Sequence, residues 1–394
     1  MKLKHVRLTP VSIPRRTGVI NLHVLVRLET ENGAVGWGEI SDLSHVPMYQ
    51  YDFVDLERTL ENLLAGKDPH NLLRLEDEMA KSFPEEGYKY SRSGAVRQGI
   101  ELALLDLIAR VDGVPVYQLL GGQLRDRIKV CYPIFAMRSA SEVADNLERV
   151  AQAYAEGFDL IRVYVGANEE ADTQFLRQFA EQFGDRVAIK SLDFSNAIHW
   201  RQALAAAERY ADIVDFMLVE SVSQHFDNDG LVEFRRRSRW PVSEHVQHLF
   251  HGWQLLSQGC VDILNISPYL LGGLRPCLRL VSLAEAARAS VLIGTTQELG
   301  VGTAAVAHLG AAARVLDYPS DNTGPHLYTH DVVRQQVRYE GGFLFVPDGP
   351  GLGVEVDESR LADLAEQASW SFSGKNVIGL RDRIPDPVQP GDTQ

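Results

Sequence analysis

The feature that most constrains the fold is a repeat of short apolar strand, turn and helix that begins near Lys129. Each apolar segment is separated from the next by a stretch with helical periodicity. The segments read VCYPIFAM, DLIRVYV, VAIKSLDF, DFMLVES, PVSEHV, VDILNIS and SVLIGTT. Such a repeat, with a period of roughly 25 to 30 residues, indicates a parallel β/α barrel. The alternative is an open doubly wound sheet, which usually carries a glycine-rich turn after its first strand, and this sequence has none there.

Two further regions flank the repeat. Residues 1–128 read first as strands, with a hairpin signal in ENG (31–33), and then as amphipathic helices. We therefore expect an N-terminal α+β capping domain over residues 1–128 and a (β/α)7β TIM-like barrel over 129–322. After the barrel the strand–helix repeat gives way to short strands and turns, which predicts a C-terminal segment, 323–384, that returns to the cap. The Pro-rich polar tail, 385–394, is expected to be disordered.

The bulk composition narrows the class of partner. A net charge of −14 argues against nucleic acid or an anionic membrane as a partner. The sequence has no run long and apolar enough to cross a membrane and no apolar signal core. The three cysteines show no metal-binding spacing, which is typical of buried thiols in a reducing compartment. We expect a cytoplasmic protein.

Acidic residues end three consecutive strands of the predicted barrel: Asp193, Glu220 and Glu244. In a parallel barrel the carboxyl ends of the strands form one mouth, so these three side chains should converge there. Ionised carboxylates that lie close together repel each other unless a cation neutralises them. Because all the ligands are oxygen, we expect Mg²⁺. Each acid taken alone could equally be a helix cap or a surface charge.

The whole chain resembles the enolase superfamily, in the branch of mandelate racemase and muconate lactonizing enzyme. Five segments carry the resemblance: GWGEI (36–40), IELALLDLIARVDGVPVYQLLGG (100–122), VDILNIS with the following GG (261–273), GTTQELGVGTAA (294–305) and PDGPGLGVEV (347–356). The resemblance implies an enzyme that binds a substrate carboxylate to Mg²⁺ and removes its α-proton to give a metal-stabilised enediolate. It assigns Asp193, Glu220 and Glu244 as metal ligands, although the family usually has Gly-Glu or Asp-Glu where this chain has Ser243-Glu244. It also implies a homo-oligomer.

The chain departs from the family at the base positions. Arg162 and Tyr164 stand where the family typically has Lys-x-Lys, and Ser267 stands where many relatives carry a lysine or an aspartate. The GTTQE stretch also lacks the histidine of a His-Asp pair. A proton transfer that inverts a centre needs one acid or base on each face of the substrate. These departures therefore disfavour racemisation and favour chemistry with a single base.

Several residues are candidates for that base. Tyr164 could be ionised beside Arg162 and the metal, or it could only donate a hydrogen bond while Arg162 binds a substrate oxygen or a ligand carboxylate. His245 has a suitable ordinary pKa, but alternation from Glu244 would point it away from the barrel axis unless the strand has already ended there. Glu298 matches a glutamate found near the substrate in muconate lactonizing relatives. Lys190 is excluded, because alternation from Asp193 faces it towards the helices.

Substrate choice is expected to depend on the cap. The matching loops are Arg15 to Ile20 and Val46 to Tyr51, in which Arg15 and Arg16 could bind a distal anionic or hydroxylated group. At the barrel, Ser267 is a further candidate contact. So are Asp317 and Asp321, near the eighth strand position.

Three functions follow from these expectations. The first is a Mg²⁺-dependent lyase, most plausibly a dehydratase of a sugar acid or hydroxy acid. The second is a cycloisomerase or other isomerase of the muconate lactonizing type. The third is a degenerate member that binds metal without turnover.

Overall fold

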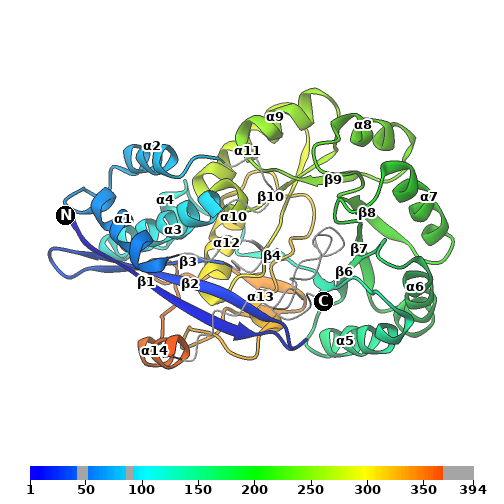
Figure 1. The fold of residues 1–394 in the computed structure, drawn as a ribbon, viewed down its shortest axis with the longest axis horizontal. Helices are drawn as coiled ribbons and strands as arrows, with labels where there is room; N and C mark the ends of the chain where they lie inside the picture. The colour runs from blue at the N-terminus through cyan, green and yellow to red at the C-terminus, as the bar shows by residue number, and fades with distance from the viewer. Residues whose placement is uncertain (42–51, 86–91, 367–394) are drawn as a thin grey trace, which may run out of the picture.

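The computed structural model describes residues 1–41, 52–85 and 92–366. The described chain forms an α+β cap, a curled parallel sheet wrapped by helices, and a C-terminal segment that runs back along the cap (Figure 1). No helix in these three stretches is long and apolar enough to cross a membrane.

The cap is a three-stranded antiparallel sheet packed against helices. Its elements are β1 (Leu3–Pro14), β2 (Ile20–Thr30), β3 (Val35–Ile40), α1 (Phe53–Leu64), α2 (Leu72–Ser82), α3 (Arg92–Asp112) and α4 (Val116–Leu119). The GWGEI segment forms β3, and its glycines let α3 lie directly on the sheet. A Cβ at Gly36 would lie 2.3 Å from the Ala103 carbonyl oxygen, and one at Gly38 would lie 2.0 Å from that of Gly99. Any side chain at either glycine would push α3 away.

The barrel region contains seven parallel strands, which pair in the order β11-β10-β9-β8-β7-β6-β5. They are β5 (Tyr132–Ile134), β6 (Leu160–Tyr164), β7 (Ala188–Asp193), β8 (Phe216–Glu220), β9 (Val242–His245), β10 (Ile263–Ile266) and β11 (Ser290–Ile293). The helices between them are the short 3₁₀ helix η2 (Ala140–Glu142), α5 (Val143–Ala155), α6 (Glu169–Phe183), α7 (Trp200–Ala211), α8 (Asn228–Arg237), α9 (Leu249–Ser257), α10 (Pro268–Leu271), α11 (Leu274–Ala287) and α12 (Gly300–Ala312). The predicted order of strands and helices is the order found.

The two edges of this sheet are joined by a short extended segment instead of a regular eighth strand. Ser320 forms an isolated parallel bridge with Val130, and its amide donates to the Lys129 carbonyl at 2.9 Å. On the other side, the Asp321 amide donates to the Ile293 carbonyl at 3.0 Å. The exact (β/α)7β topology is therefore not confirmed, although the sheet closes at the expected place.

The C-terminal segment contacts the cap. It contains α13 (Gly324–Leu327) and α14 (Glu358–Glu366), and α14 packs on β1. A third small sheet joins β12 (Tyr339–Glu340) and β13 (Phe343–Phe345) to β4 (Arg127–Lys129), in the order β12-β13-β4. Buried Asp106 on α3 connects the parts, because it accepts hydrogen bonds of 2.8 Å from both the Trp37 and the Leu352 amides. The predicted tail, 385–394, lies outside the described residues, and the domain boundaries stay a prediction.

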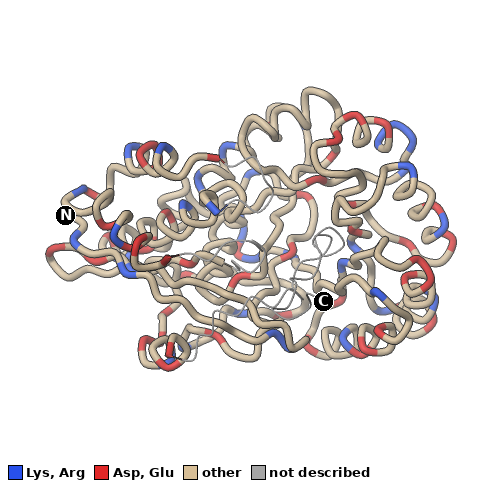
Figure 2. The backbone as a smooth tube through the Cα atoms, viewed as in Figure 1, with Lys and Arg blue, Asp and Glu red and all other residues tan. Residues whose placement is uncertain are grey.

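Positions of basic and acidic residues are interspersed along the outer helices of the barrel (Figure 2). All three cysteines, Cys131, Cys260 and Cys277, are buried and form no disulfide. The interior of the barrel mouth, by contrast, holds several buried charged side chains.

Candidate functional site

The three predicted carboxylates lie on neighbouring strands at the barrel mouth. Asp193 ends β7 and is in register with Glu220, which ends β8. Glu244 lies next to the last residue of β9, the following strand. All three side chains are buried or nearly so. Parallel strands end at a common edge, so the residue pattern places these acids together as expected.

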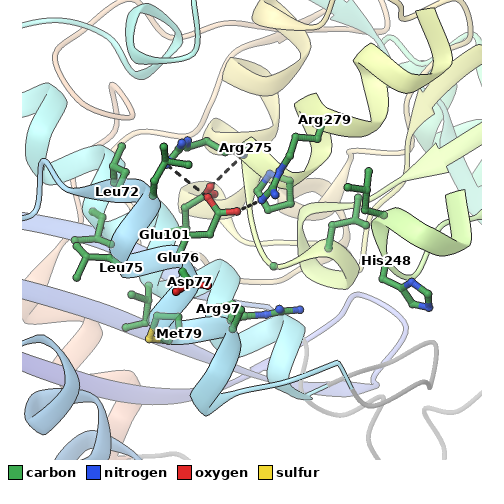
Figure 3. A pocket seen from close by; sticks show the side chains of 18 of the residues that line it. Leu72, Leu75, Glu76, Asp77, Met79, Arg97, Glu101, His248, Arg275 and Arg279 are labelled. Carbon is green, nitrogen blue, oxygen red and sulfur yellow. Dashed lines mark hydrogen bonds and ion pairs between the residues drawn. The ribbon is translucent and has the colours of Figure 1, made fainter. Parts of the chain in front are cut away.

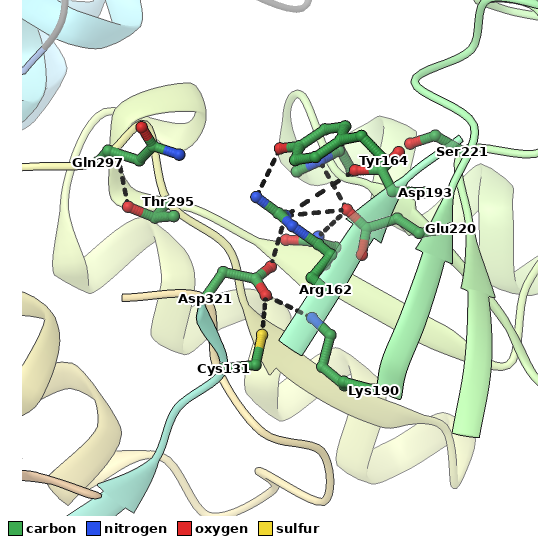
Figure 4. Close-up of polar contacts among 12 residues, drawn as sticks. Cys131, Arg162, Tyr164, Lys190, Asp193, Glu220, Ser221, Thr295, Gln297 and Asp321 are labelled. Carbon is green, nitrogen blue, oxygen red and sulfur yellow. Dashed lines mark hydrogen bonds and ion pairs between the residues drawn. The ribbon is translucent and has the colours of Figure 1, made fainter. Parts of the chain in front are cut away.

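Arg162 points into this site from β6 and contacts the carboxylates there (Figure 4). One terminal nitrogen, Nη1, lies 2.9 Å from an Asp321 oxygen, 3.4 Å from Glu220 and 3.9 Å from Asp193. The other, Nη2, donates to the Tyr164 hydroxyl at 2.5 Å, and the guanidinium lies over the Tyr164 ring at 4.6 Å. A buried arginine is stable only when its charge is compensated in this way.

Lys190 also faces the barrel interior, so its exclusion was wrong. The pairing of β6 with β7 shifts between Ile161 and Arg162, which leaves Lys190 as an extra residue in β7. Such a bulge breaks the two-residue alternation and turns the side chain inward. The Lys190 ammonium is fully buried and lies 2.5 Å from Asp321. Although burial would lower the pKa of Lys190, the Asp321 carboxylate raises it, so the lysine stays charged.

Asp321 is the centre of a buried polar cluster beneath the mouth. Its Oδ1 atom faces the Lys190 ammonium and accepts a hydrogen bond from the Cys131 thiol at 2.9 Å, while Oδ2 faces Arg162. Burial and the Asp321 charge raise the pKa of Cys131, so its thiol stays protonated.

Glu220 is held by donors on three sides. The Nε2 atom of His245 lies 3.2 Å from its Oε1 atom, and the Asn265 amide donates to the same oxygen at 3.2 Å. Burial alone would raise the pKa of Glu220, but the hydrogen bond from His245 and the charges of Lys190 and Arg162 hold it below its ordinary value. His245 is the last residue of β9, so regular alternation ends there and its side chain reaches Glu220.

Glu244 is oriented by its neighbours in the loops after β7 and β8. The Asn196 amide donates to its Oε2 atom at 2.7 Å, and the Ser221 hydroxyl donates to its Oε1 atom at 3.4 Å. Ser195, Asn196 and Ser221 each have a φ of 55°, a left-handed conformation that is uncommon for residues other than glycine. Backbone strain of this kind, directly after two site carboxylates, often accompanies function.

Glu298 does not face the carboxylate cluster. Its oxygens accept hydrogen bonds from the Thr295 hydroxyl and from the amide and hydroxyl of Thr296, the amide at 3.0 Å. Burial raises the pKa of Glu298. This geometry stabilises the loop between β11 and α12 and gives the predicted catalytic role no support. Gln297, the preceding residue, has a φ of 70° and a buried Oε1 atom that no described group contacts.

The predicted substrate contacts occupy different places. Arg15 is buried, and its guanidinium lies over the Phe135 ring at 5.5 Å. Phe135 in turn stacks on the Tyr164 ring at 5.8 Å, so the Phe135 ring lies between Arg15 and Tyr164. Arg16 is half-exposed and forms an ion pair with Glu156 at 2.5 Å. The loop Val46 to Tyr51 lies outside the described residues.

Ser267 directly follows β10 at the mouth, and its buried hydroxyl has no hydrogen-bond partner in the described chain. Asp317 is exposed, and its amide donates to the carbonyl of Val291 near the start of β11. That position is at the opposite end of the barrel, so the prediction that Asp317 contacts substrate is wrong. Asp321, four residues later, is the acid that enters the site.

Sequence reasoning missed Asn196 and Asn265. Asn265 lies two residues before Ser267 on an otherwise apolar strand, so alternation could have placed both on one face. Asn196 follows Asp193 in a loop, and its contact depends on a left-handed backbone that no residue pattern announces.

The charge of the cluster suits a divalent cation. Three carboxylates, of Asp193, Glu220 and Asp321, contact Arg162, and Asp321 also contacts Lys190. The fourth carboxylate at the mouth, that of Glu244, lies on the neighbouring strand β9. With His245 neutral, two negative charges remain uncompensated. In addition, the buried Oε2 atom of Glu220 has no hydrogen-bond partner among the described residues.

The geometry of the described residues is not that of a complete cation cage. Within them, no three His, Cys, Asp or Glu side chains are arranged so that they could already hold a metal ion. Glu244 is directed to Asn196 and Ser221, and the guanidinium of Arg162 lies against Glu220. The donor set nevertheless fits Mg²⁺ in chemistry and charge, because the three predicted ligands are all carboxylates.

A cavity of about 360 Å³ lies between the cap and the barrel, lined by α2, α3, α9 and α11 (Figure 3). Buried Glu101 accepts hydrogen bonds from the Leu274 and Arg275 amides at the start of α11, the latter at 3.1 Å. Glu76, on the other wall, forms ion pairs with Arg275 and Arg279. These contacts join the cap to the barrel, and this cavity holds none of the mouth carboxylates.

Comparisons with known families cover most of the chain. Residues 2–121 match the family described as mandelate racemase / muconate lactonizing enzyme, N-terminal domain. Residues 145–360 match the family described as enolase C-terminal domain-like.

Individual relatives agree with these matches. Muconate cycloisomerase 1 of Pseudomonas putida is 29% identical over 359 residues, which cover 87% of this chain and 90% of that protein. D-galactarolactone cycloisomerase of Agrobacterium fabrum is 26% identical over 355 residues, with 86% and 90% covered. The solved structure of muconate lactonizing enzyme from Pseudomonas putida superposes with a TM-score of 0.83 at 24% identity, over 92% of this chain and 99% of that one, which shows a shared fold.

Proposed function

Since this chain belongs to the enolase superfamily, in the branch of mandelate racemase and muconate lactonizing enzyme, we propose that it is a Mg²⁺-dependent isomerase that removes the proton α to a carboxylate on a hydroxylated small molecule. Enzymes of this superfamily depend on Mg²⁺ in general. The observation that carries the proposal is the Arg162–Tyr164 pair, which lies beside the carboxylate cluster where two lysines would be expected.

Tyr164 is the proposed base. Its hydroxyl receives a short hydrogen bond from a guanidinium that is charged at any physiological pH, and this contact favours the phenolate. Arg162 would stabilise the phenolate of Tyr164 before the reaction. The phenolate oxygen would then take the α-proton from the substrate and become a neutral phenol. Bound Mg²⁺ would supply positive charge to the substrate carboxylate while the α-carbon loses its proton.

The site supports chemistry with one base better than inversion with two. Lys190 is the lysine that the described chain brings to this site, and Asp321 keeps it protonated and fully buried. Ser267 stands at the second family position and is a poor acid or base. Intramolecular ring closure or opening needs a single base, so we infer a cycloisomerase.

Unpartnered polar groups at the mouth favour a hydroxylated substrate. The Ser267 hydroxyl, the Gln297 carbonyl and both polar atoms of the Asn322 amide are buried without a hydrogen-bond partner in the described chain. Each such group costs about 1–3 kcal/mol while it stays unpaired. A substrate with hydroxyl groups would satisfy them, whereas a purely apolar chain would not.

Dehydration is the second candidate, because His245 could act as the acid that it needs. The Nε2 atom of His245 lies 3.2 Å from Glu220, and an imidazolium at this place could protonate a departing hydroxide. Both candidates share the same first step and differ in whether water is lost.

The test is incubation with Mg²⁺ in D₂O and a library of hydroxy acids, sugar acids and their lactones, followed by NMR. Incorporation of α-deuterium together with an isomeric product supports the proposal. Incorporation with loss of water supports the dehydratase instead. If no compound exchanges or reacts while Mg²⁺ still binds, both are wrong and the chain is a metal-binding member without turnover.

A further inference from the structure

The Arg162 guanidinium and a bound metal ion would compete for the same oxygens. Nη1 of Arg162 lies 3.4 Å from Glu220 and 3.9 Å from Asp193, two of the three proposed metal ligands. Contacts of this length are loose, since charged hydrogen bonds are usually about 2.7–2.9 Å. A small displacement of the guanidinium would turn either contact into a tight ion pair and exclude the metal.

Asp321 holds the guanidinium back from these ligands. Its contact with Nη1, at 2.9 Å, is the shortest of the three carboxylate contacts that this nitrogen makes. Asp321 lies between β11 and β5, across the barrel from Glu220 on β8, so it draws Nη1 in the opposite direction. Because Nη2 is bonded to Tyr164, the guanidinium is fixed at both ends.

Asp321 is itself fixed from behind. Its second oxygen faces the buried Lys190 ammonium and accepts the hydrogen bond from the Cys131 thiol. Two residues of the barrel interior therefore set its orientation, and the bulge in β7 is what places one of them there. Rotamers fixed in this way keep a site in its productive geometry.

We propose that Asp321, held in place by Lys190, is a positioning residue that keeps the Arg162 guanidinium on Tyr164 and away from the metal-binding oxygens of Glu220 and Asp193. This inference rests on the proposed function, because it presumes a divalent cation at those oxygens. In this arrangement Asp321 acts through the Arg162 guanidinium.

The test is a double-mutant cycle in metal binding, measured by calorimetry with Mg²⁺ on the full chain. The variants are Asp321→Asn, Arg162→Met and the two combined. Asp172→Asn serves as the matched control, since Asp172 is a buried carboxylate on α6 that accepts from the Gly166 amide at 2.7 Å outside the site. Circular dichroism and thermal unfolding of each variant establish that it is folded.

We expect Asp321→Asn to weaken Mg²⁺ binding at least tenfold, because the released guanidinium moves onto Glu220 and Asp193. Arg162→Met should bind Mg²⁺ as tightly as the parent or more tightly, and adding Asp321→Asn to it should change little. The control should bind like the parent.

Three results would overturn the inference. Equal binding by Asp321→Asn and the parent would show that Asp321 does not protect the ligands. An equal loss with and without Arg162 would show that Asp321 acts only through its charge. If Asp321→Asn does not fold, weaker Mg²⁺ binding by Arg162→Met than by the parent decides against the inference, since removal of the competing guanidinium should not lower Mg²⁺ affinity. A parent protein that binds no Mg²⁺ would instead refute the proposed function.

Discussion

Replacing Tyr164 by phenylalanine removes the proposed base and little else. The ring would keep its stacking on Phe135 at 5.8 Å and its contact with the Arg162 guanidinium at 4.6 Å. The change deletes the hydroxyl that accepts from Nη2 at 2.5 Å. A hydrogen bond to a charged group contributes about 1.5–3 kcal/mol to stability, so the variant should remain folded.

The effect on the reaction should be larger. Ionising a phenol of ordinary pKa at pH 7 costs about 4 kcal/mol, and the fixed guanidinium charge is what offsets that cost here. A positioned general base typically accelerates proton transfer by about 10²–10⁴, equivalent to about 3–5 kcal/mol of activation free energy. We expect Tyr164→Phe to slow α-deuterium exchange by a factor in this range.

The assay is the rate of α-deuterium incorporation in D₂O with whichever substrate the library identifies. Tyr132→Phe is the matched control, because Tyr132 is a buried tyrosine on the neighbouring strand β5 whose ring packs on Phe158 at 5.6 Å. An exchange rate for Tyr164→Phe within about threefold of the parent would refute the assignment of the base. His245 would then be the next residue to replace.

Two further changes test the surroundings of the site. Asn196→Gly removes the side-chain amide that donates to Glu244 at 2.7 Å, while glycine still allows the backbone φ of 55°. This variant should bind Mg²⁺ about 10–100-fold more weakly in calorimetry. Unchanged affinity would contradict the role of Asn196. Burial raises the pKa of Glu101 from 4.5 to about 7, although the Leu274 and Arg275 amides lower it, so the native state keeps a proton that the unfolded chain releases. Stability should therefore fall by about 3 kcal/mol as the pH rises from about 4.5 to about 7. Glu101→Gln should remove that slope in urea unfolding; an unaltered slope would show that other groups cause it.

The sequence predicted those parts of the site that depend only on strand order. Asp193, Glu220 and Glu244 follow from where apolar segments end, because parallel strands bring their carboxyl ends to one edge. Arg162 and Tyr164 followed from alternation within β6, since both are polar residues on one face of an otherwise apolar strand.

The parts that failed depend on local irregularities. The direction of Lys190 was predicted wrongly because of a bulge in β7. A bulge reverses which face of the strand the following residues occupy, and no residue composition marks it. Asp317 and Asp321 were both candidate contacts, and the sequence could not separate them, because the position at which the chain enters the closing segment is set by hydrogen bonds to the two sheet edges. The direction of His245 could not be predicted, because it depends on where β9 ends.

The account depends most directly on the place of the metal ion. Crystals grown with Mn²⁺, which anomalous scattering can distinguish from water, would locate it. We predict one anomalous peak at the barrel mouth within coordination distance of Asp193, Glu220 and Glu244, with the Arg162 guanidinium still bonded to Asp321. No peak at saturating Mn²⁺, or a peak elsewhere while Arg162 lies between Glu220 and Asp193, would contradict the account.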